Sequence, residues 1–212
     1  MSLFCKKIVP SAVLGIWEIT ESLETLHQQS SLSAAERSYY TTLKSTMRKK
    51  HWLSYRLIVP HILPPPSVSG ISYDEYGKPL LENGTGYVSA AHSGKFAALI
   101  ASKNNNVGLD IEAINPKIVR ISHKFLSAAE MEYDFAGKET ESLSLIWCAK
   151  EALYKLFGKG GLSFARHLQV EPFIYDGQGT VTGKIASEHI SRSFSVHYET
   201  LEGYMMVYVI DH

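Results

Sequence analysis

Apolar and polar residues follow one another along this chain with two different periods, which predict a mixture of strands and helices. Strand-like segments, with apolar residues at every second position or in short runs, lie at 8–20, 87–91, 96–102, 107–112 and from about 168 onward. Helix-like segments lie at about 46–62, after Pro116 and at 147–155. Polar turns at 92–94 and 104–106 favour a meander of the middle strands. We therefore predict an α+β fold.

The predicted helices carry recognisable start and stop signals. Ser33 is followed three residues later by Glu36, the pattern of a capping box, in which each side chain bonds the backbone N–H of the other residue. Ser127 and Glu130 repeat this pattern, and we expect a second capped helix there. The three prolines at 64–66 and the glycine at 158 are expected to end the two long helices.

The sequence also contains a long internal repeat. The five residues at 32–36, Leu-Ser-Ala-Ala-Glu, recur unchanged at 126–130, which is 94 residues further along the chain. Two further pairs keep nearly the same spacing, namely Trp52 with Trp147 and Gly15 with Gly108. The order of these matches predicts a duplicated lobe, with an N-terminal lobe at 1–102 and a C-terminal lobe at 103–212 that share one cleft.

Three acidic residues occur in the second copy of the repeat only. Asp110 and Glu112 lie two residues apart in a strand-like segment, so their side chains point to the same side. Glu151 and Lys155 share one face of the predicted helix with Trp147. In the alignment of the two copies the acids fall on non-acidic residues, Trp17, Ile19 and Arg56. We therefore predict one asymmetric site for an anionic ligand.

Three converging carboxylates repel one another and need a cation or protons. Two like charges about 4 Å apart repel by roughly 4 kcal/mol at an effective dielectric constant of about 20. Hard oxygen ligands without His or Cys suit Mg²⁺, which keeps several waters and takes phosphate oxygens of a substrate. Asp110, Glu112 and Glu151 are therefore the candidate metal ligands. A solvated strand face and a surface Glu-Lys pair are the alternative interpretations of these residues.

Composition and charge narrow the class of protein. Among 212 residues, 21 Lys and Arg balance 21 Asp and Glu, so no overall field favours nucleic acid or an anionic membrane as a partner. Two cysteines are too few for a disulfide framework and lack metal-ligand spacing, which favours a reducing compartment. No apolar run has the length of a signal peptide or a membrane span. We expect a cytoplasmic globular protein.

Three segments, taken in order, resemble the signature of the 4'-phosphopantetheinyl transferase superfamily. They are residues 108–112, 125–130 and 147–155. Each segment alone is a weak signal, whereas the spaced combination is specific. The resemblance extends upstream through Arg56 and the segments 77–79 and 92–94 to the monomeric, two-lobed branch of the superfamily, the surfactin-synthetase-activating type.

This resemblance implies a fold, an activity and a set of site residues. The fold would be a pseudo-two-fold α+β duplication with coenzyme A held between the lobes. The activity would be the Mg²⁺-dependent transfer of 4'-phosphopantetheine from coenzyme A to a serine hydroxyl of an apo-acyl, peptidyl or aryl carrier protein, which releases 3',5'-ADP. By the family pattern Asp110, Glu112 and Glu151 hold Mg²⁺, Glu151 also helps to deprotonate the serine, and Lys155 neutralises charge on the leaving phosphate. The implied contacts with coenzyme A are Arg56, Lys78, Pro79, His92, Lys150 and Lys155.

The sequence departs from the family pattern at one position, and two other functions are alternatives to the transferase. Many relatives carry a serine where this chain has Ala91, so the hydroxyl before His92 is missing here. A catalytically silent module that binds coenzyme A or a carrier protein, and a Mg²⁺-dependent hydrolase of a nucleotide diphosphate, are the alternative functions. Basic residues that follow the acidic strand are candidates to contact an acidic carrier, with a solvated helix face as the alternative: Lys117, Arg120, His123 and Lys124.

Overall fold

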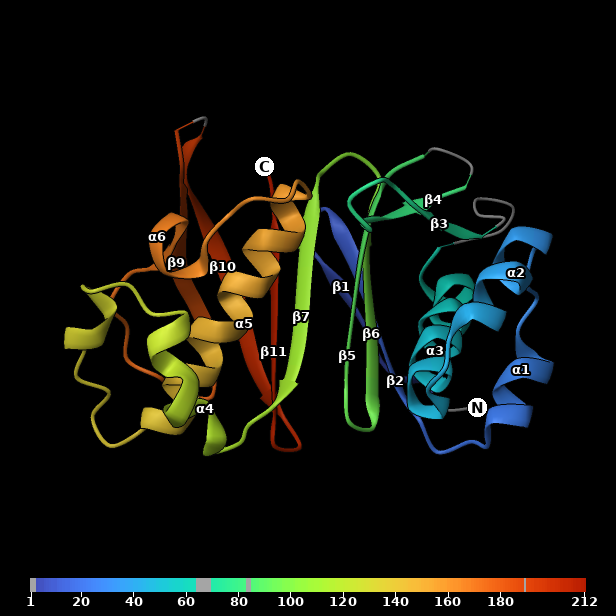
Figure 1. The fold of residues 1–212 in the computed structure, drawn as a ribbon, viewed down its shortest axis with the longest axis horizontal. Coiled ribbons are helices and arrows are strands. Elements are labelled where there is room, and N and C mark those ends of the chain that lie inside the picture. Colours follow the sequence, from blue (N-terminus) through green and yellow to red (C-terminus); the bar gives the residue numbers. More distant parts are fainter. Residues whose placement is uncertain (1–2, 64–69, 83–84, 189) are drawn as a thin grey trace. The chain divides into compact units, whose positions relative to one another are not determined.

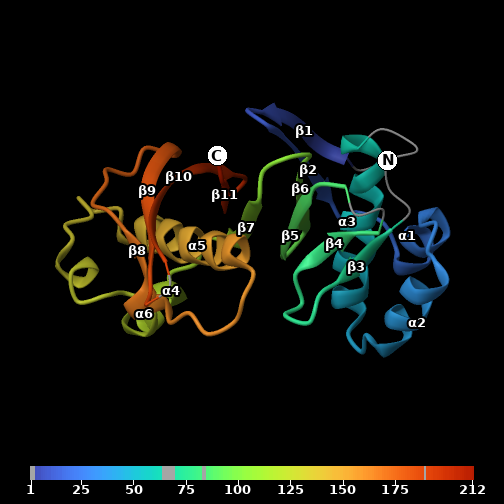
Figure 2. The ribbon, with the colours of Figure 1, turned by 90° about the horizontal axis from the view of Figure 1, so that it is seen from above.

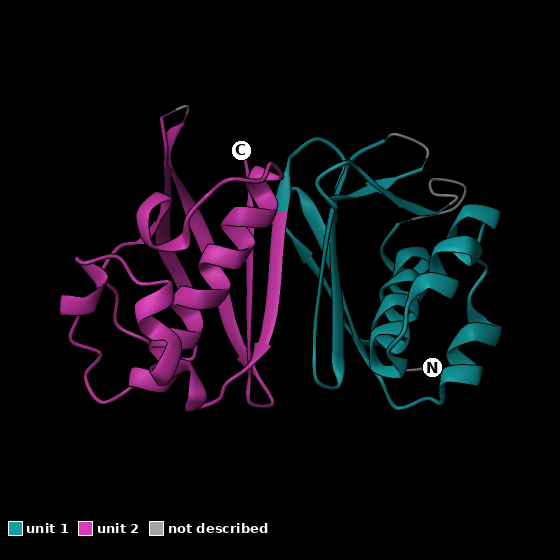
Figure 3. Cartoon of the chain, viewed as in Figure 1, with its two compact units in different colours: residues 1–107 teal, residues 108–212 magenta. Residues whose placement is uncertain are grey.

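The structure, a computed structural model, consists of two compact units, residues 1–107 and 108–212 (Figure 3). It describes residues 3–63, 70–82, 85–188 and 190–212. The boundary between the units lies at the start of β7 (Val107–Ala113), whereas the sequence suggested a boundary after residue 102, in the turn before this strand. Each unit has a hydrophobic core of its own.

Unit 1 is a four-stranded antiparallel sheet with helices on one face (Figure 1). Its strands, in spatial order, are β1 (Leu3–Val9), β2 (Ala12–Glu18), β6 (Phe96–Ser102) and β5 (Tyr87–Ser93). The helices are α1 (Leu23–Gln29), α2 (Ala34–Thr42) and α3 (Thr46–Ile62), of which α3 packs on β2 and β6. A small hairpin of β3 (Ile71–Tyr73) and β4 (Pro79–Leu81) contacts β5 through β4.

Unit 2 is a five-stranded sheet crossed on one face by the long helix α5 (Glu139–Phe157), as Figure 2 shows from above. The strands, in spatial order, are β7, β11 (Tyr204–Ile210), β10 (Ser191–Leu201), β9 (Gln178–Ala186) and β8 (Leu168–Val170). Shorter helices are α4 (Lys117–Ile121) and α6 (Phe164–His167), with 3-10 turns at Ser122–Lys124 and Glu130–Glu132. The α+β fold predicted from the sequence is confirmed.

The two units repeat one topology. In unit 1 the strand order β2-β6-β5 continues into the hairpin β4-β3, and in unit 2 the order is β7-β11-β10-β9-β8. Both orders begin with the strand before the helices, continue with the last strand of the unit, and end at the strand that follows the long helix. β1 is an additional edge strand of unit 1. The duplication predicted from the repeated segments 32–36 and 126–130 is therefore visible in the topology of the chain.

Two glycines at matching places let each long helix lie close to its sheet. A Cβ atom on Gly15 of β2 would lie 2.3 Å from Cγ2 of Ile58 in α3. A Cβ atom on Gly108 of β7 would lie 1.9 Å from the carbonyl oxygen of Ala152 in α5. Interiors are packed too densely to accept contacts this short. The predicted match of Gly15 with Gly108 thus corresponds to one packing contact that occurs in both units.

The capping box at the start of α2 forms as predicted. The Ser33 Oγ accepts a hydrogen bond of 3.2 Å from the Glu36 N–H, and the Glu36 carboxylate accepts one of 3.0 Å from the Ser33 N–H. The same reciprocal pair joins Ser127 and Glu130, at 3.3 and 2.7 Å. The repeated sequence therefore builds the same local hydrogen bonds in both units.

The predicted α-helix after Ser127 is wrong, because only the 3-10 turn Glu130–Glu132 follows the second capping box. The chain leaves this turn at Tyr133, whose hydroxyl donates a hydrogen bond of 2.9 Å to the Val170 carbonyl. Ala136 and Gly137 then adopt left-handed backbone conformations, with φ of 49° and 78°. A tertiary contact has replaced local helix propensity here.

The other predicted boundaries are mostly close to those observed. α3 spans the predicted 46–62, and α5 ends at Gly158 in the left-handed conformation, with φ of 70°. His92 and Ser93 lie in β5 and not in a turn, because the hairpin reverses at Gly94, whose φ is 51°. The three prolines at 64–66 lie outside the described residues. Within the described part of the chain, no helix is both long enough and apolar enough to cross a bilayer.

Candidate functional site

β7 and α5 bring the predicted site residues Asp110, Glu151 and Lys155 together in unit 2. Asp110 is buried, with 4% of its surface exposed, and its Oδ1 lies 2.7 Å from the Lys155 Nζ. The Lys155 ammonium also donates a hydrogen bond of 3.0 Å to the Leu109 carbonyl. The close approach of β7 to α5 at Gly108 places Asp110 within reach of α5. The backbone of this strand therefore positions the Asp110 side chain.

The second oxygen of Asp110 accepts no hydrogen bond of good geometry from the described residues, although the buried Cys148 thiol interacts with this carboxylate. This Oδ2 is buried, and only the Oδ1 is paired with Lys155. A buried acceptor without a partner costs about 1 to 3 kcal/mol. Such an orphaned oxygen is a feature that a bound cation would stabilise.

Glu151 carries the clearest electrostatic perturbation of the site. The pKa of its carboxyl is raised to about 7, mainly by burial; the charges of Asp110 and Glu112 contribute to this rise, and Lys155 opposes it. A carboxyl with this pKa exchanges its proton near neutral pH, which suits a general base. Two acids, Asp110 and Glu112, and one cation, Lys155, act on this carboxyl.

Two neighbours of the acids keep defined protonation states. Burial lowers the pKa of Lys155, but Asp110 and Glu151 raise it more strongly, so the ammonium stays charged. Burial raises the pKa of the Cys148 thiol, and Asp110 and Glu112 raise it further. The thiol donates a weak hydrogen bond of 3.8 Å to the Met205 carbonyl. Cys148 is therefore a neutral, buried side chain.

The acids have the chemistry of a Mg²⁺ site without a preformed ligand cage. Among the described residues, no three His, Cys, Asp or Glu side chains are already grouped as a metal site. The donor set of Asp110, Glu112 and Glu151 nevertheless consists of hard oxygens, one of them orphaned, with excess negative charge. Mg²⁺ is commonly held by one or two carboxylates, with water and substrate oxygens as the remaining ligands. The residues present therefore fit this ion.

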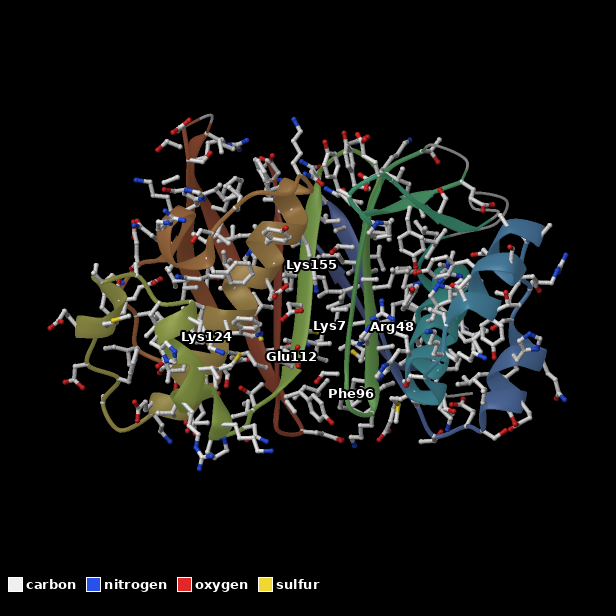
Figure 4. All side chains as sticks on the ribbon, in the orientation of Figure 1. Lys7, Arg48, Phe96, Glu112, Lys124 and Lys155 are labelled. Carbon is white, nitrogen blue, oxygen red and sulfur yellow. The ribbon has the colours of Figure 1, made fainter. Side chains whose placement is uncertain are left out.

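A cluster in unit 1 combines predicted His92 with two residues that sequence reasoning missed. The Nη1 of Arg48 lies 2.7 Å from the Nε2 of His92, as an exposed guanidinium on α3 that reaches toward β5 (Figure 4). The His51 ring stacks on the His92 ring, with centroids 4.3 Å apart and planes 2° apart. The Nε2 of His51 is also 2.8 Å from the Gly94 carbonyl. The missed signal was the spacing of Arg48 and His51, three residues apart on a predicted helix.

The charges of this cluster suit an anion. Burial lowers the pKa of His51, and the Arg48 guanidinium lowers it further, against the opposing effect of the Gly94 carbonyl. The imidazole is therefore held neutral beside a permanent positive charge. Arg side chains bind phosphate oxygens through two parallel hydrogen bonds.

Lys78 and Pro79 lie where the β3-β4 hairpin closes. The Asp74 carboxylate accepts hydrogen bonds from the N–H groups of Tyr76 and Lys78, at 2.9 and 2.8 Å, and Gly77 has a φ of 81°. The Lys78 ammonium donates 2.7 Å to the Asn106 side chain, and burial lowers its pKa. Lys78 is thus a partly buried hairpin residue and not a solvated turn lysine. The ligand role of Lys78 and Pro79 stays a prediction.

Arg56 and Lys150, predicted to contact coenzyme A, are buried and paired with protein groups. The Arg56 guanidinium bonds Glu36 at 2.7 Å and the carbonyls of Ile71 and Trp52 at 3.0 and 3.2 Å. The Lys150 ammonium is fully buried and bonds Glu130 at 2.6 Å. Coenzyme A contacts of these two cations stay a prediction.

These two ion pairs correct one step of the internal alignment. Glu36 matches Glu130, and their partners Arg56 and Lys150 are separated by the same 94 residues. Arg56 therefore corresponds to Lys150. The alignment made from the sequence had matched it with Glu151 instead. That match followed from pairing Trp52 with Trp147, and this pair deviates by one residue from the spacing of 94 residues that the ion pairs keep.

A pocket of about 270 Å³ lies beside Glu112. Its wall is largely apolar, with Trp147 from α5, and its rim carries Lys117. The other basic residues that follow the acidic strand lie in α4 and the 3-10 turn after it: Arg120, His123 and Lys124. Glu112, Lys117 and Trp147, which are separate in the sequence, thus line one pocket of unit 2.

Comparison with known sequences identifies relatives of this chain. The family model described as the 4'-phosphopantetheinyl transferase superfamily matches residues 106–209. The 4'-phosphopantetheinyl transferase AcpT of Salmonella typhi is 31% identical over 118 residues, which are 53% of this chain and 60% of that protein. AcpT of Escherichia coli (strain K12) is 32% identical over 117 residues, 52% of this chain and 59% of that protein. The 4'-phosphopantetheinyl transferase Sfp of Bacillus subtilis (strain 168) is 29% identical over 146 residues, 66% of this chain and 62% of that protein.

The matches to AcpT and Sfp span about 60% of the length of these relatives. The region matched by the family model contains β7 with Asp110 and Glu112, and the whole of α5 with Glu151 and Lys155. The three segments that carried the resemblance therefore lie inside this region. Residues 106–209 of this chain therefore match the 4'-phosphopantetheinyl transferase superfamily.

Proposed function

We propose that this protein is a two-lobed 4'-phosphopantetheinyl transferase. It moves the 4'-phosphopantetheine group from coenzyme A to a serine hydroxyl of an apo-carrier protein, depends on Mg²⁺ and releases 3',5'-ADP. The observation that supports this function best is the group formed by Asp110, Glu151 and Lys155, which lies inside the region shared with the superfamily.

In the proposed reaction the serine oxygen attacks the phosphorus that bears pantetheine, and the bond from this phosphorus to the oxygen of 3',5'-ADP breaks. Glu151 takes the serine proton, directly or through a water molecule, because its raised pKa of about 7 suits this exchange. Lys155 stays cationic and stabilises negative charge on the leaving phosphate. Asp110 holds the Lys155 ammonium in place at 2.7 Å.

The proposed metal ligands are Asp110, Glu112 and Glu151. Bound Mg²⁺ would supply positive charge to the diphosphate oxygens. The orphaned Oδ2 of Asp110 supports this assignment, and so do the negative charges of Asp110 and Glu112, which add to the effect of burial on the pKa of Glu151.

Unit 1 supplies the proposed contacts with the phosphates of coenzyme A. The exposed Arg48 guanidinium, supported by His92 and the stacked His51, is the strongest candidate to bind the 3'-phosphate. Lys78 and Pro79 on the β3-β4 hairpin remain proposed contacts with the same co-substrate.

The carrier protein is proposed to dock on α4 and the 3-10 turn after it. Carrier proteins are expected to be acidic around the modified serine, which fits the basic side chains of Lys117, Arg120 and Lys124. The adjoining pocket with Trp147 offers apolar surface next to Glu112. Apolar surface with a charged rim is the usual composition of a protein interface.

The experiment that tests this function is to incubate the protein with coenzyme A, Mg²⁺ and an apo-carrier protein and then to weigh the carrier. A transferase adds one phosphopantetheinyl group to the serine, whereas a hydrolase releases 3',5'-ADP without changing the carrier mass. A silent module does neither. Glu151→Gln should abolish most of the transfer, and Glu132→Gln, an exposed acid in the same unit, is the matched control. An unmodified carrier in every reaction would refute the proposal.

A further inference from the structure

Unit 2 contains a buried ion pair that connects α5 to two other segments. Glu130 is 1% exposed and Lys150 is fully buried, and their charged groups are 2.6 Å apart. The Glu130 Oε1 accepts a hydrogen bond of 2.9 Å from the Val170 N–H of β8, and its Oε2 accepts one of 2.7 Å from the Ser127 N–H. We refer to this pair with its backbone partners as the Glu130 clasp. It ties α5 to the capping box and to β8.

The ammonium end of the Glu130 clasp is fully used by the protein. Besides Glu130, the Lys150 Nζ donates to the carbonyl oxygens of Phe125 at 2.7 Å and Phe164 at 3.1 Å. An ammonium has three N–H donors, and each has an acceptor here. Lys150 could contact a ligand only if one of these bonds broke, so its function in this structure is to hold α5.

Unit 1 contains the corresponding pair, the Glu36 clasp. The Glu36 Oε1 lies 2.7 Å from the Arg56 Nε of α3 and accepts a hydrogen bond of 3.2 Å from the Ile71 N–H of β3. The Arg56 guanidinium carbon also lies over the Trp52 ring, 3.3 Å from its centroid. The same capping-box glutamate therefore binds the long helix and the next strand in both units. One arrangement kept in two copies with different cations indicates a common structural task.

The position of Lys150 on α5 shows what this task is in unit 2. Successive residues of an α-helix are turned by about 100°, so Lys150 and Ala152 lie on nearly opposite faces. Ala152 is the residue against which Gly108 of β7 packs. The clasp and this contact therefore fix α5 from two sides. Glu151 and Lys155 lie on the helix between these two faces; Lys155 is paired with Asp110, and the charge of Asp110 acts on Glu151.

We propose that Glu130 and Lys150 are positioning residues for the carboxylates and the lysine of unit 2, and that Glu36 and Arg56 position the phosphate-binding face of α3. A buried ion pair is seldom needed for stability, because apolar residues of similar volume serve as well, but it can specify one arrangement among several. The inference rests on the proposed function and names the residues that set its geometry. It predicts that each clasp controls only the chemistry of its own unit.

The test compares the same substitution in the two copies, Glu130→Gln and Glu36→Gln. Binding of Mn²⁺ alone is measured by calorimetry, and KM for coenzyme A and kcat are measured with an apo-carrier. Glu130→Gln should weaken Mn²⁺ binding by about 10 to 100-fold, the usual effect of residues that orient metal ligands, and should lower kcat more than it raises KM. Glu36→Gln should raise KM for coenzyme A and leave Mn²⁺ binding unchanged. Equal losses in both variants, or unchanged values in both, would overturn the proposal.

A double variant separates positioning from stability. Glu130→Gln with Lys150→Met removes both charges at similar volume, so no unpaired charge stays buried. If the clasp positions Glu151, this variant should regain the melting temperature of the wild type but not its Mn²⁺ affinity. Recovery of both would mean that the pair is only stabilising, and the proposal would fail.

Fluorine spectra make the outcome independent of the proposed activity. The chain has three tryptophans, and 5-fluorotryptophan gives one resonance for each. Trp147 packs on Phe125 and Phe164, whose carbonyls bind Lys150, so Glu130→Gln should shift the Trp147 resonance and Glu36→Gln that of Trp52. If the wild type neither binds Mn²⁺ nor modifies a carrier, the proposed function fails, and these shifts alone decide the clasps. Shifts that are not confined to the substituted unit would refute them.

Discussion

At the scale of single residues, the candidate site of unit 2 contains three acids, Asp110, Glu112 and Glu151, and one cation, Lys155. This excess of acids makes the protonation of the site depend on pH. Asp110 has one partner for two carboxylate oxygens, and Glu151 is pushed toward its neutral form by burial and by its acidic neighbours. Lys155 is the cation that both acids share. Site residues of this kind store unfavourable electrostatic energy that ligand binding can release.

This charge excess predicts how the stability of the metal-free protein depends on pH. The Glu151 pKa is near 4.5 in the unfolded chain and about 7 in the folded one. Between these values the folded state binds more protons, so the free energy of unfolding falls as pH rises from about 4.5 to 7, by about 2 to 3 kcal/mol in all. Urea unfolding with a chelator present should show this fall in the wild type and not in Glu151→Gln. Identical pH profiles of the two proteins would contradict the assignment.

The Arg48 guanidinium should determine recognition of the 3'-phosphate. Arg48→Ala should raise KM for coenzyme A by about tenfold or more with a smaller change in kcat, because a charged hydrogen bond to a remote group contributes about 1.5 to 3 kcal/mol to ground and transition states alike. Dephospho-coenzyme A should discriminate little between wild type and variant. Lys44→Ala, an exposed cation just before α3, is the control. Equal impairment with both donors would show that Arg48 does not bind this phosphate.

At the scale of secondary-structure elements, the fold depends on how closely each long helix approaches its sheet. Gly108→Ala should destabilise the protein by more than about 3 kcal/mol, since the new methyl group would meet the backbone oxygen of Ala152 at 1.9 Å. Gly15→Ala should cost less, because the new methyl group meets side-chain methyl groups of Ile58 and Ile62 and not the backbone of the helix. Gly160→Ala, with open space around it, should be nearly neutral. Denaturant midpoints give the order, and a Gly108→Ala protein as stable as Gly160→Ala would exclude this packing argument.

Elements with strong local signals could be predicted from the sequence, and those fixed by tertiary contacts could not. α3 follows from its periodicity, and the capping box at Ser33 follows from spacing alone. The same box at Ser127 opens only a 3-10 turn, because Tyr133 bonds the distant Val170 carbonyl. The candidate acids of β7 and α5 could be proposed from the sequence, because Asp110 and Glu112 have the spacing of a strand and Glu151 and Lys155 that of a helix. Arg48 was missed because its partner His92 lies 44 positions away, on another element.

The buried cations show a second reason why prediction from sequence stops short. Glu36 and Glu130 were recognised only as capping residues, since the capping pattern is local. Their further bonds, to Arg56 and Lys150, join segments 20 residues apart and leave no trace in the local pattern. The sequence therefore suggested only a ligand contact for Lys150, and its bonds to Glu130, Phe125 and Phe164 could not be predicted.

At the scale of the whole molecule, the chain contains two copies of one topology but the acids of one site. Trp17, which occupies in β2 the place of Asp110 in β7, is 2% exposed and belongs to the apolar core of unit 1. Apolar side chains cannot replace water or oxygen ligands around Mg²⁺. The packing of the lobe is thus common to both units, whereas the proposed metal ligands occur in unit 2 alone.

This asymmetry predicts one metal ion and one coenzyme A per chain, in a protein that works as a monomer. Because both copies of the lobe are already joined in one chain, a second chain has no missing element to supply, and specific activity should not fall on dilution. Mn²⁺ titration in the presence of coenzyme A should saturate at one equivalent per chain, beside sedimentation at the mass of about 23.6 kDa. Asp110→Asn should abolish this binding completely, because unit 1 holds no second set of carboxylates at the matching strand. Two equivalents of Mn²⁺, residual binding in Asp110→Asn, or activity confined to a dimer would each contradict this view of the duplication.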